Sequence, residues 1–224
     1  MYRLDKILSL SDPVHTMADI GTDHGFVPYL FLKENLAQKA IAIDISEPSL
    51  NKAKELLKNL HKDYDCRLGD GLKALKKKEC QAIIIAGMGG ALISKILEEG
   101  LDIAKDCQYL IVQPMQGVDI LRENLARLGF FIEKEELAFE RGKYYHIFKI
   151  FYCPKRSLEP QGISRAFLAN NDPLKESWFQ FEIKRREKVL ENLNKAKNFE
   201  RQKDKAEKVR KEIEKLKEWL HASC

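Results

Sequence analysis

Residues 19–25, Asp-Ile-Gly-Thr-Asp-His-Gly, follow the largely apolar run 16–18 and precede a segment with a helical pattern. A second apolar run, 40–43, ends on Asp44. A strand, a glycine turn, a helix and a second strand closed by an acid make up one half of a nucleotide-binding α/β fold. The glycines of such a fold let a ligand approach the backbone, and the acid accepts its ribose hydroxyls. This unit therefore predicts a parallel sheet with a nucleoside-binding edge.

The spacing of the glycines limits which nucleoside ligand can bind. Gly21 and Gly25 are separated by three residues, which differs from the G-x-G-x-x-G spacing of dinucleotide sites. Asp19 and Asp23 flank the turn, and they would repel a pyrophosphate strongly in a partly dry pocket. A cationic sulfonium would be attracted, so we predict S-adenosylmethionine rather than NAD or FAD. The two glycines alone also fit an ordinary strand–turn–helix, and Asp44 outweighs that alternative.

A further acid stands where a third strand should end. The tripeptide Gly69-Asp70-Gly71 follows the short run 66–68, and the Asp70 carboxylate can accept the exocyclic amine of adenine. An ordinary Asp-Gly turn explains the tripeptide equally well when it is read in isolation.

Apolar runs and helical patterns alternate through residues 1–156, which we expect to form the S-adenosylmethionine-binding domain. Strands are expected at 16–20, 40–45, 66–68, 81–86 and 109–113. Ser46 can cap the helix after the second strand, and a helix at 117–128 should stop at Gly129. The runs 130–136 and 144–152 then read as an antiparallel hairpin.

Five alternating units followed by a hairpin indicate the α/β fold class of the class I (Rossmann-like) S-adenosylmethionine-dependent methyltransferase sheet. A plain dinucleotide fold would end on a further helix–strand unit. Ligands of open α/β sheets bind at the carboxyl ends of the strands, where these acids and glycines fall.

The last part of the chain has a different pattern. Residues 154–160 read as a linker, and 161–224 read as a basic, coiled-coil-like helical hairpin. Apolar seams are expected at Ala206, Val209, Ile213, Leu216 and Leu220, and at Leu174, Trp178, Phe181, Arg185, Val189, Leu193 and Ala196. The segment 161–224 carries the whole formal charge of +5, which predicts a polyanionic partner. A solvated helical surface is an equal alternative from charge alone.

Length and composition indicate the size of the core, the cellular compartment, and whether a metal or a membrane is a partner. With 224 residues, the chain can form one core of ordinary size and an appendage. The five cysteines are scattered and the histidines dispersed, so we expect a cytoplasmic protein without a metal site. The longest apolar stretch, 82–93, is interrupted by glycines and is too short to span a bilayer, so no membrane partner is expected.

Four segments together resemble the bacterial tRNA (adenine-22-N1)-methyltransferase family, TrmK: 19–25, 69–72, 85–90 and 113–114. The resemblance covers essentially the whole chain. It implies methyl transfer from S-adenosylmethionine to adenine N1 in the D-arm region of tRNA. Two residues depart from the family pattern. Met115 replaces an asparagine after Gln113-Pro114, and Asp44 stands where relatives often carry glutamate.

The expected site residues fall into three groups. Cofactor binding is expected of Asp19, Gly21, Gly25, Asp44, Ile45, Asp70, Gly71, Ala86 and Gly87. Asp23 is the candidate to stabilise the cationic product base and His24 to orient the base, although His24 serving the turn itself is an equal alternative. Substrate or RNA contacts are expected of Phe26, Tyr29, Met88, Gln113, Lys184, Arg185 and Arg186. For Phe26 and Tyr29, a place in the hydrophobic core is the stronger alternative. Further phosphate contacts are expected of Lys195, Lys197, Arg201, Lys203 and Lys205.

Other functions remain open from sequence. A class I methyltransferase acting on another RNA or a small molecule is the nearest alternative, and a non-catalytic scaffold with a retained fold is another. An NAD-dependent oxidoreductase has the wrong glycine spacing. A monomer is favoured, and the sequence leaves open whether the helical hairpin contacts RNA or pairs two protomers.

Overall fold

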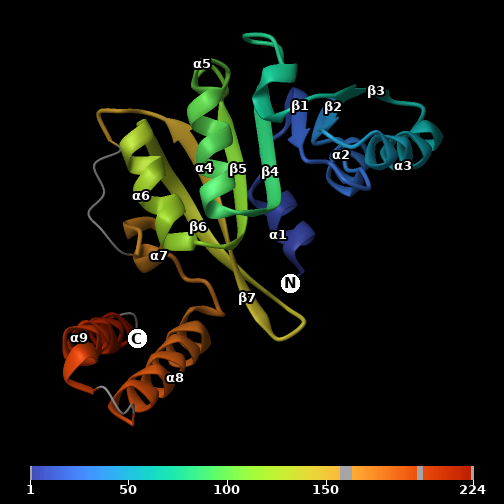
Figure 1. Cartoon of the computed structure of the whole chain (residues 1–224). Helices are drawn as coiled ribbons and strands as arrows, with labels where there is room; N and C mark the ends of the chain where they lie inside the picture. The colour runs from blue at the N-terminus through green and yellow to red at the C-terminus, as the bar shows by residue number, and fades with distance from the viewer. Residues whose placement is uncertain (1, 157–162, 196–198, 223–224) are drawn as a thin grey trace. The chain divides into compact units, whose positions relative to one another are not determined.

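The computed structural model describes residues 2–156, 163–195 and 199–222, with the side chains of 199–201 excluded. It divides into two compact units, Met1–Asn170 and Asn171–Cys224 (Figure 1). The first unit is longer than the domain 1–156 expected from sequence, and the linker expected at 154–160 lies partly outside the described residues.

The first unit is built on a seven-stranded sheet with the order β3-β2-β1-β4-β5-β7-β6. Neighbours from β3 to β5 are parallel, while β7 is antiparallel to both β5 and β6. The expected class I methyltransferase sheet is confirmed. The strands are β1 Val14–Ile20, β2 Ala37–Asp44, β3 Asp63–Leu68, β4 Ala82–Gly89, β5 Tyr109–Gln116, β6 Phe130–Glu140 and β7 Lys143–Tyr152.

Helices connect the strands. They are α1 Arg3–Leu10, α2 Phe26–Lys33, α3 Glu47–Leu57, α4 Gly90–Glu99, α5 Leu101–Ala104, α6 Val118–Leu128 and α7 Arg165–Ala169, with short 3-10 turns η1 Lys58–Leu60 and η2 Gly71–Ala74. Two expected helix boundaries are confirmed. The Ser46 hydroxyl accepts a hydrogen bond from Ser49 N at the start of α3, and Gly129 ends α6 in the left-handed conformation.

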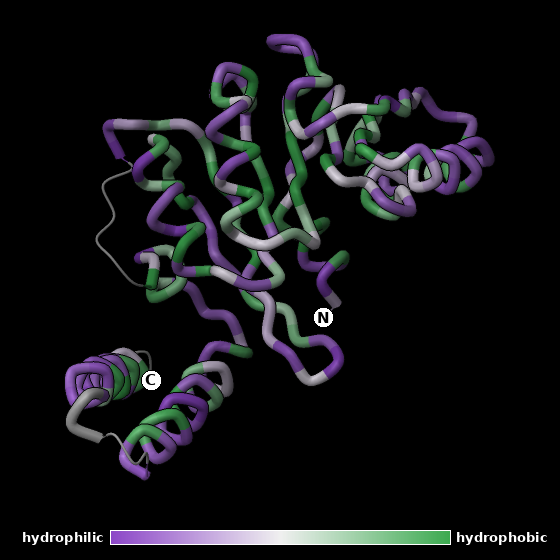
Figure 2. Tube along the Cα trace, in the orientation of Figure 1, coloured by the Kyte–Doolittle hydropathy of each residue, from purple (hydrophilic) through white to green (hydrophobic). Residues whose placement is uncertain are grey.

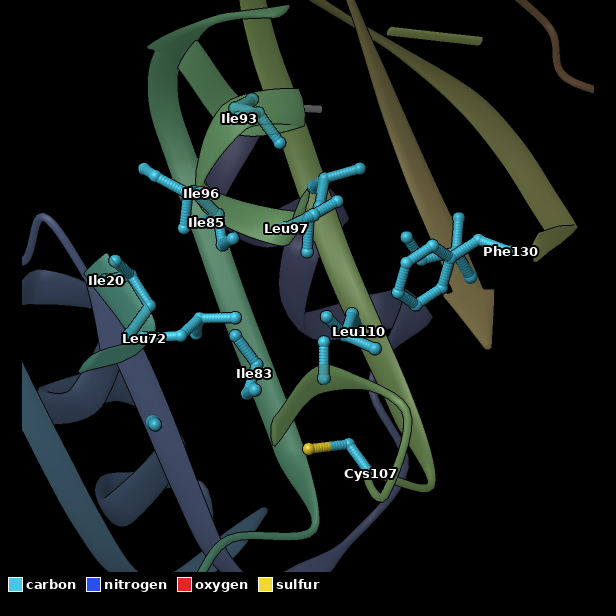
Figure 3. Close-up of a cluster of buried hydrophobic side chains, with 14 of the residues drawn as sticks. Ile20, Leu72, Ile83, Ile85, Ile93, Ile96, Leu97, Cys107, Leu110 and Phe130 are labelled. Carbon is cyan, nitrogen blue, oxygen red and sulfur yellow. The ribbon is translucent and has the colours of Figure 1, made fainter. Parts of the chain in front are cut away.

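The central strands are apolar on both faces because helices cover both faces of the sheet. Ile83 and Ile85 of β4 pack in one cluster with Leu110 of β5, and Ile84 lies in a second cluster on the opposite face. Figure 3 shows the first cluster, to which α4 contributes Ile93, Ile96 and Leu97. Coloured by hydropathy, β4 is a largely hydrophobic stretch, as expected of a central parallel strand (Figure 2).

The expected ends of β4 and β5 were wrong. The sequence predicted that β4 would break at Gly87 and β5 would end at Pro114, but they continue to Gly89 and Gln116. Their pairing shifts register between Ala86 and Met88. This β-bulge absorbs one extra residue in β4, so that the two strands remain paired beyond it.

A buried charged network closes the first unit. Glu135 of β6 is fully buried and accepts hydrogen bonds from Arg122 of α6 at 2.5 Å and from Ser164 at 2.5 Å, while His146 lies 2.7 Å away. Ser164 also caps α7 by accepting a hydrogen bond from Phe167 N. The network therefore holds α7 against β6, which explains why the first unit extends beyond residue 156.

The second unit consists of α8 Lys175–Asn194 and α9 Phe199–Ala222, which pack against each other. The seam expected on α9 is confirmed, because Ala206, Val209, Ile213 and Leu216 are buried; Leu220 is half-buried.

The stripe expected on α8 was partly wrong. Phe181, Val189 and Arg185 are exposed, whereas Phe179 and Ile183 are buried together with the expected Trp178 and Leu193. On this face Arg186 pairs with Glu182 of the same helix and with Glu212 of α9. Ala196, the last expected member, lies outside the described residues.

Candidate active site

The polar residues at the strand ends meet at one edge of the sheet. The connection from β3 to β4 passes beyond β1, so the strand order reverses between β1 and β4. Ligands of open α/β sheets bind outside the carboxyl ends of the strands at such a point. The loops that follow β1, β2, β3, β4 and β5 all begin at this edge.

The turn after β1 is fixed to β2 and to α3. Gly21 N and Thr22 N both donate to Ile43 O, at 2.8 Å and 3.0 Å. Gly25 has a φ of +76°, and a Cβ there would lie 2.8 Å from the Ala53 Cα atom of α3. Only glycine permits this approach, so Gly25 sets the position of the turn through backbone packing.

Asp44 links the ends of β1 and β2. Its Oδ2 atom accepts a hydrogen bond from Asp23 N at 3.1 Å, and its Oδ1 atom accepts one from Ser46 N at 2.8 Å. Each carboxylate oxygen keeps acceptor capacity after these bonds. The half-buried carboxylate is thus fixed in orientation and can accept the hydroxyls of a ribose.

Asp19 is a buried acid without a cation. Its side chain lies at the end of β1, is 3% exposed, and makes no ion pair with any described residue. The pKa of Asp19 is raised to about 7, mainly because burial disfavours its charged form. The neighbouring Thr22 hydroxyl lowers the pKa, and the negative charge of Asp44 raises it. The Thr22 Oγ1 atom is also buried, and no described residue lies at the distance and angle of a normal hydrogen bond to it. A buried carboxylate without a cation and a buried hydroxyl beside it fit a ligand that carries a cation and hydrogen-bond donors.

This acid leads to a pH-dependent prediction. A bound cation favours the ionised form, so below pH 7 Asp19 must lose a proton when S-adenosylmethionine binds. We expect the affinity to fall as the pH drops below 7, by up to about tenfold per pH unit. Calorimetric titration in two buffers of different ionisation enthalpy should show proton release that grows below pH 7. Asp19→Asn should abolish this proton release, and retention of the release in the variant would assign it to another group.

The ends of β2 and β3 form an apolar shelf. Ile45 is 75% exposed and Leu68 63% exposed, and Leu68 pairs with Asp44 in the sheet register. Exposed aliphatic side chains beside polar groups fit the flat face of a nucleobase. Asp70 lies next to this shelf, is exposed, and pairs with Lys73 at 3.2 Å. Gly71 begins the η2 turn in the left-handed conformation.

The bulge in β4 leaves room at the site. Gly87 has a φ of +82°, and no atom lies within 4 Å of the place where a Cβ would stand. Ala86 beside it is half-buried. Met88, an expected substrate contact, reaches across to the first turn, where a Cβ on Gly21 would lie 2.1 Å from its methyl carbon. The structure therefore brings the two glycine segments together through Met88.

Asp23, His24 and Phe26 form an exposed cluster beside Asp44. His24 Nδ1 lies 2.7 Å from Asp23 Oδ2, and His24 Nε2 lies 3.3 Å from Lys52 Nζ. The rings of His24 and Phe26 are stacked with centroids 5.7 Å apart, and Phe26 is half-exposed. Tyr29 is different, because its ring packs partly against the apolar cluster under α2.

Gln113 is buried and fully bonded at the end of β5. Its Oε1 atom accepts from Gly87 N at 3.2 Å and from Arg3 Nη1 at 3.3 Å, and its Nε2 atom donates to Pro114 O at 2.8 Å. It would contact RNA only by exchanging these bonds. Met115 is exposed, and its sulfur lies 3.2 Å from Arg3 Nη1.

Arg3 is a site residue that sequence reasoning missed. Besides Gln113, it bonds Glu140 of β6 at 3.0 Å and lies over the Tyr145 ring at 4.8 Å. No local pattern links residue 3 to a glutamine 110 positions later. The guanidinium fork holds several partners at once and fixes the orientation of the Gln113 amide.

We expect Arg3→Ala to lower kcat by about 10- to 100-fold, because Gly87 then loses its fixed partner and misplacement by about 1 Å is costly in catalysis. The dissociation constant for S-adenosylmethionine should stay within about twofold, and kcat and KM for tRNA should be measured separately. Lys6→Ala is the matched control, since Lys6 on the same helix pairs with Glu136 at 2.7 Å. An equal loss in both variants would mean that α1 acts only by anchoring the hairpin.

The side chains of the second unit that were expected to contact phosphates differ in their exposure and in their ion pairs. Lys184 is exposed and makes no ion pair with a described residue, and Lys203 and Lys205 are exposed as well. Arg185 bonds Glu182, and Arg186 is largely buried between Glu182 and Glu212. Lys195 pairs with Glu191. Lys197 and the side chain of Arg201 lie outside the described residues.

Within the described residues, no helix combines the length and the apolar composition needed to cross a membrane. Nor do three or more histidine, cysteine, aspartate or glutamate side chains of the described ranges come together in an arrangement that could hold a metal ion.

Comparison with known proteins places the chain in a family. Residues 1–148 match the family described as a methyltransferase domain. A Bacillus subtilis protein named tRNA (adenine(22)-N(1))-methyltransferase is 34% identical over 213 residues, covering 90% of this chain and 89% of that protein.

Solved structures of similar proteins point to the same family. The Bacillus subtilis tRNA methyltransferase TrmK is 30% identical with a TM-score of 0.82, over 97% of both chains. A Streptococcus pneumoniae protein in complex with S-adenosyl-L-methionine is 28% identical with a TM-score of 0.80, over 99% of this chain and 100% of that one. Identity at this level over nearly the whole length confirms the resemblance seen in the sequence motifs: the chain belongs to the tRNA (adenine(22)-N(1))-methyltransferase family.

Proposed function

We propose that this protein transfers a methyl group from S-adenosyl-L-methionine to N1 of the adenine at position 22 of tRNA. The observation that carries the proposal is the pair of carboxylates, Asp19 and Asp44, at the point between β1 and β4 where the strand order reverses. They stand in a chain that matches a Bacillus subtilis enzyme of this activity over 90% of its length.

The residues at the sheet edge fit the parts of the cofactor. Asp19 and Thr22 suit the cationic methionine moiety, and Asp44 suits the ribose hydroxyls. Ile45, Leu68 and Asp70 suit the adenine. When bound, S-adenosyl-L-methionine supplies a methyl group made electrophilic by the adjoining sulfonium.

The target nitrogen needs little proton chemistry. Adenine N1 is unprotonated at neutral pH, so its lone pair can attack the methyl carbon directly as the carbon–sulfur bond breaks. Catalysis then depends on position and electrostatics. The N1 edge normally pairs, so the base must leave its stack at a cost of a few kcal/mol. Phe26, exposed beside the site, offers a surface on which the base can stack.

Asp23 is the proposed stabiliser of the product. Methylation at N1 makes the base cationic, and the Asp23 carboxylate lies at the exposed mouth of the site, 2.7 Å from His24 Nδ1. His24 orients this carboxylate through that contact and extends the stacking surface of Phe26. A negative charge near the developing cation lowers the barrier to its formation.

We assign tRNA backbone contacts to the exposed lysines of the second unit. Replacing Lys184, Lys203 and Lys205 by glutamine should weaken tRNA binding and lower the salt slope of the association constant by roughly 2–3. Filter binding between 50 and 200 mM salt, roughly the range over which such slopes are measured, checks this. A wild-type slope would remove these lysines from the RNA interface.

The reaction is assigned to a cytoplasmic, metal-free monomer. The described cysteines Cys66, Cys80, Cys107 and Cys153 are free thiols, which fits a reducing compartment. N1 attack also needs no metal-bound hydroxide or Lewis acid to activate the nucleophile.

The test of this function is transfer of labelled methyl groups to an unmodified tRNA transcript, mapped by reverse-transcription stops. A matched transcript with guanine in place of adenine at position 22 serves as the control. We expect a cofactor-dependent stop at position 22 in the first transcript and none in the second. Equal methylation of both transcripts would show that the enzyme acts on another RNA position.

A further inference from the structure

The turn between β6 and β7 extends beyond the edge of the sheet that carries the site. β7 pairs with β5 antiparallel, with Leu110 opposite Ile150 and Val112 opposite Phe148. This pairing stops at Val112 and Phe148, and β7 begins five residues before Phe148, at Lys143. The turn at Arg141 and Gly142 therefore projects past the carboxyl end of β5, as Figure 1 shows.

The base of this turn is fixed next to the site. Arg3 bonds Glu140, the last residue of β6, at 3.0 Å and Gln113 at 3.3 Å. Gln113 in turn bonds Gly87 at the β4 bulge. One guanidinium thus connects the projecting turn to the place where the cofactor and the target base must meet.

The turn itself is short and stiff. Arg141 and Gly142 both have positive φ, at 52° and 76°. Two consecutive left-handed residues are typical of the tight type I′ connection of a hairpin. The side chains on either side of it are therefore held in place rather than carried by a mobile loop.

The surface of the turn combines an aromatic pair with free cations. Phe139 and Tyr144 contact each other with ring centroids 4.7 Å apart, and Phe139 is 44% exposed. Arg141 and Lys143 are exposed and make no ion pair with any described residue. Glu140, the residue before Arg141, pairs with Arg3. An exposed aromatic ring beside cations that make no ion pair is a combination that binds single-stranded nucleic acid, and the half-buried Tyr144 supports the exposed Phe139 ring here.

A purely structural role explains only part of these features. Phe139 and Tyr144 are directly opposite in the hairpin register, and such a pair stabilises a hairpin. That role does not require Phe139 to be half-exposed, nor two unpaired cations beside it. The position past the site edge also suits a substrate that must present one base there.

We infer that this turn is an RNA-contacting element: Phe139 and Tyr144 stack on an unpaired nucleobase of the tRNA near the target adenine, and Arg141 and Lys143 contact the adjoining phosphates. The inference rests on tRNA as the substrate, as proposed above. Stacking would position the strand, and the phosphate contacts would add affinity that falls with salt.

The test compares three full-length variants with the wild-type protein. Arg141→Gln/Lys143→Gln removes the cations, and Phe139→Leu keeps an apolar side chain but removes the ring. Lys134→Gln/Lys155→Gln is the matched control, since both lysines are exposed, make no ion pair with described residues, and lie toward the other end of the hairpin. Each variant's dissociation constants for an unmodified tRNA transcript, over a range of salt, and for S-adenosylmethionine are measured.

We expect the Arg141→Gln/Lys143→Gln variant to bind tRNA about tenfold more weakly and to lower the salt slope by roughly 1–2. Phe139→Leu should weaken binding by about 5- to 100-fold without changing the slope. The affinity for S-adenosylmethionine should remain at the wild-type value in all variants.

The inference is overturned if the Arg141→Gln/Lys143→Gln variant matches the control in affinity and slope. Because both cations are exposed, this variant tests the inference even where Phe139→Leu destabilises the hairpin. Failure of the proposed function has a separate signature, since the wild-type protein would then not methylate tRNA at all. A wild-type protein that methylates tRNA, with variants that bind it equally well, rejects this inference alone.

Discussion

Arg122→Ala is expected to lower the free energy of unfolding by about 3–5 kcal/mol, the cost of stranding one partner of a buried ion pair. Arg122 is 7% exposed and bonds Glu135, which is fully buried in β6. Removing the guanidinium leaves a carboxylate in the core with His146 as its remaining close titratable partner. Chemical denaturation followed by circular dichroism measures the change.

The control for this variant lies on the same helix. Arg127 of α6 pairs with Glu98, and both side chains are more than half exposed. Exposed pairs contribute about 0–1 kcal/mol, so Arg127→Ala should change little. A loss in Arg122→Ala no larger than in Arg127→Ala would contradict a stabilising role for the buried network.

The same network predicts how stability depends on pH. Burial alone would raise the pKa of Glu135, but the charges and hydrogen bonds of Arg122 and His146 lower it to about 2, from 4.5. A lowered folded-state pKa contributes stability above the unfolded value, and this contribution is lost as the pH falls from about 4.5 towards 2. The wild-type protein should therefore lose more stability over this range than Arg122→Ala does.

Asp44→Ala is expected to weaken S-adenosylmethionine binding by about 1–3 kcal/mol, or about 5- to 150-fold. The ribose hydroxyls lose their acceptor, and Asp23 N and Ser46 N lose the carboxylate that orders the turn. Isothermal titration calorimetry with the purified protein gives the affinity.

Glu47→Ala is the matched control for this change. Glu47 is an exposed acid three positions further along the chain, at the start of α3. Its removal should leave the affinity for S-adenosylmethionine within about twofold, because surface substitutions away from a site have small effects. Unchanged binding in Asp44→Ala would show that Asp44 does not hold the ribose.

The local features of this fold could be predicted from sequence because short segments determine them. Ser46 caps a helix and Gly129 ends one through their own side-chain chemistry and backbone freedom. The acids at the strand ends were predicted because a parallel sheet brings all its carboxyl ends to one edge.

The features that were missed depend on distant contacts. The bulge at Gly87 keeps β4 and β5 paired, and nothing in the local sequence specifies that pairing. Arg3 reaches Gln113 only after α1 packs against the hairpin. Glu135 stands in a strand with charged neighbours on both sides, so its burial depends on Arg122 and His146, which arrive from other elements.

The most direct test of the proposed function is the identity of the methylated nucleoside. After reaction of the wild-type protein with S-adenosylmethionine and an unmodified tRNA transcript, the RNA is digested at neutral pH and its nucleosides are resolved by mass spectrometry. Direct attack by the ring nitrogen predicts 1-methyladenosine, at one residue per tRNA. N6-methyladenosine, or a methylated nucleoside other than adenosine, would contradict this account of the site.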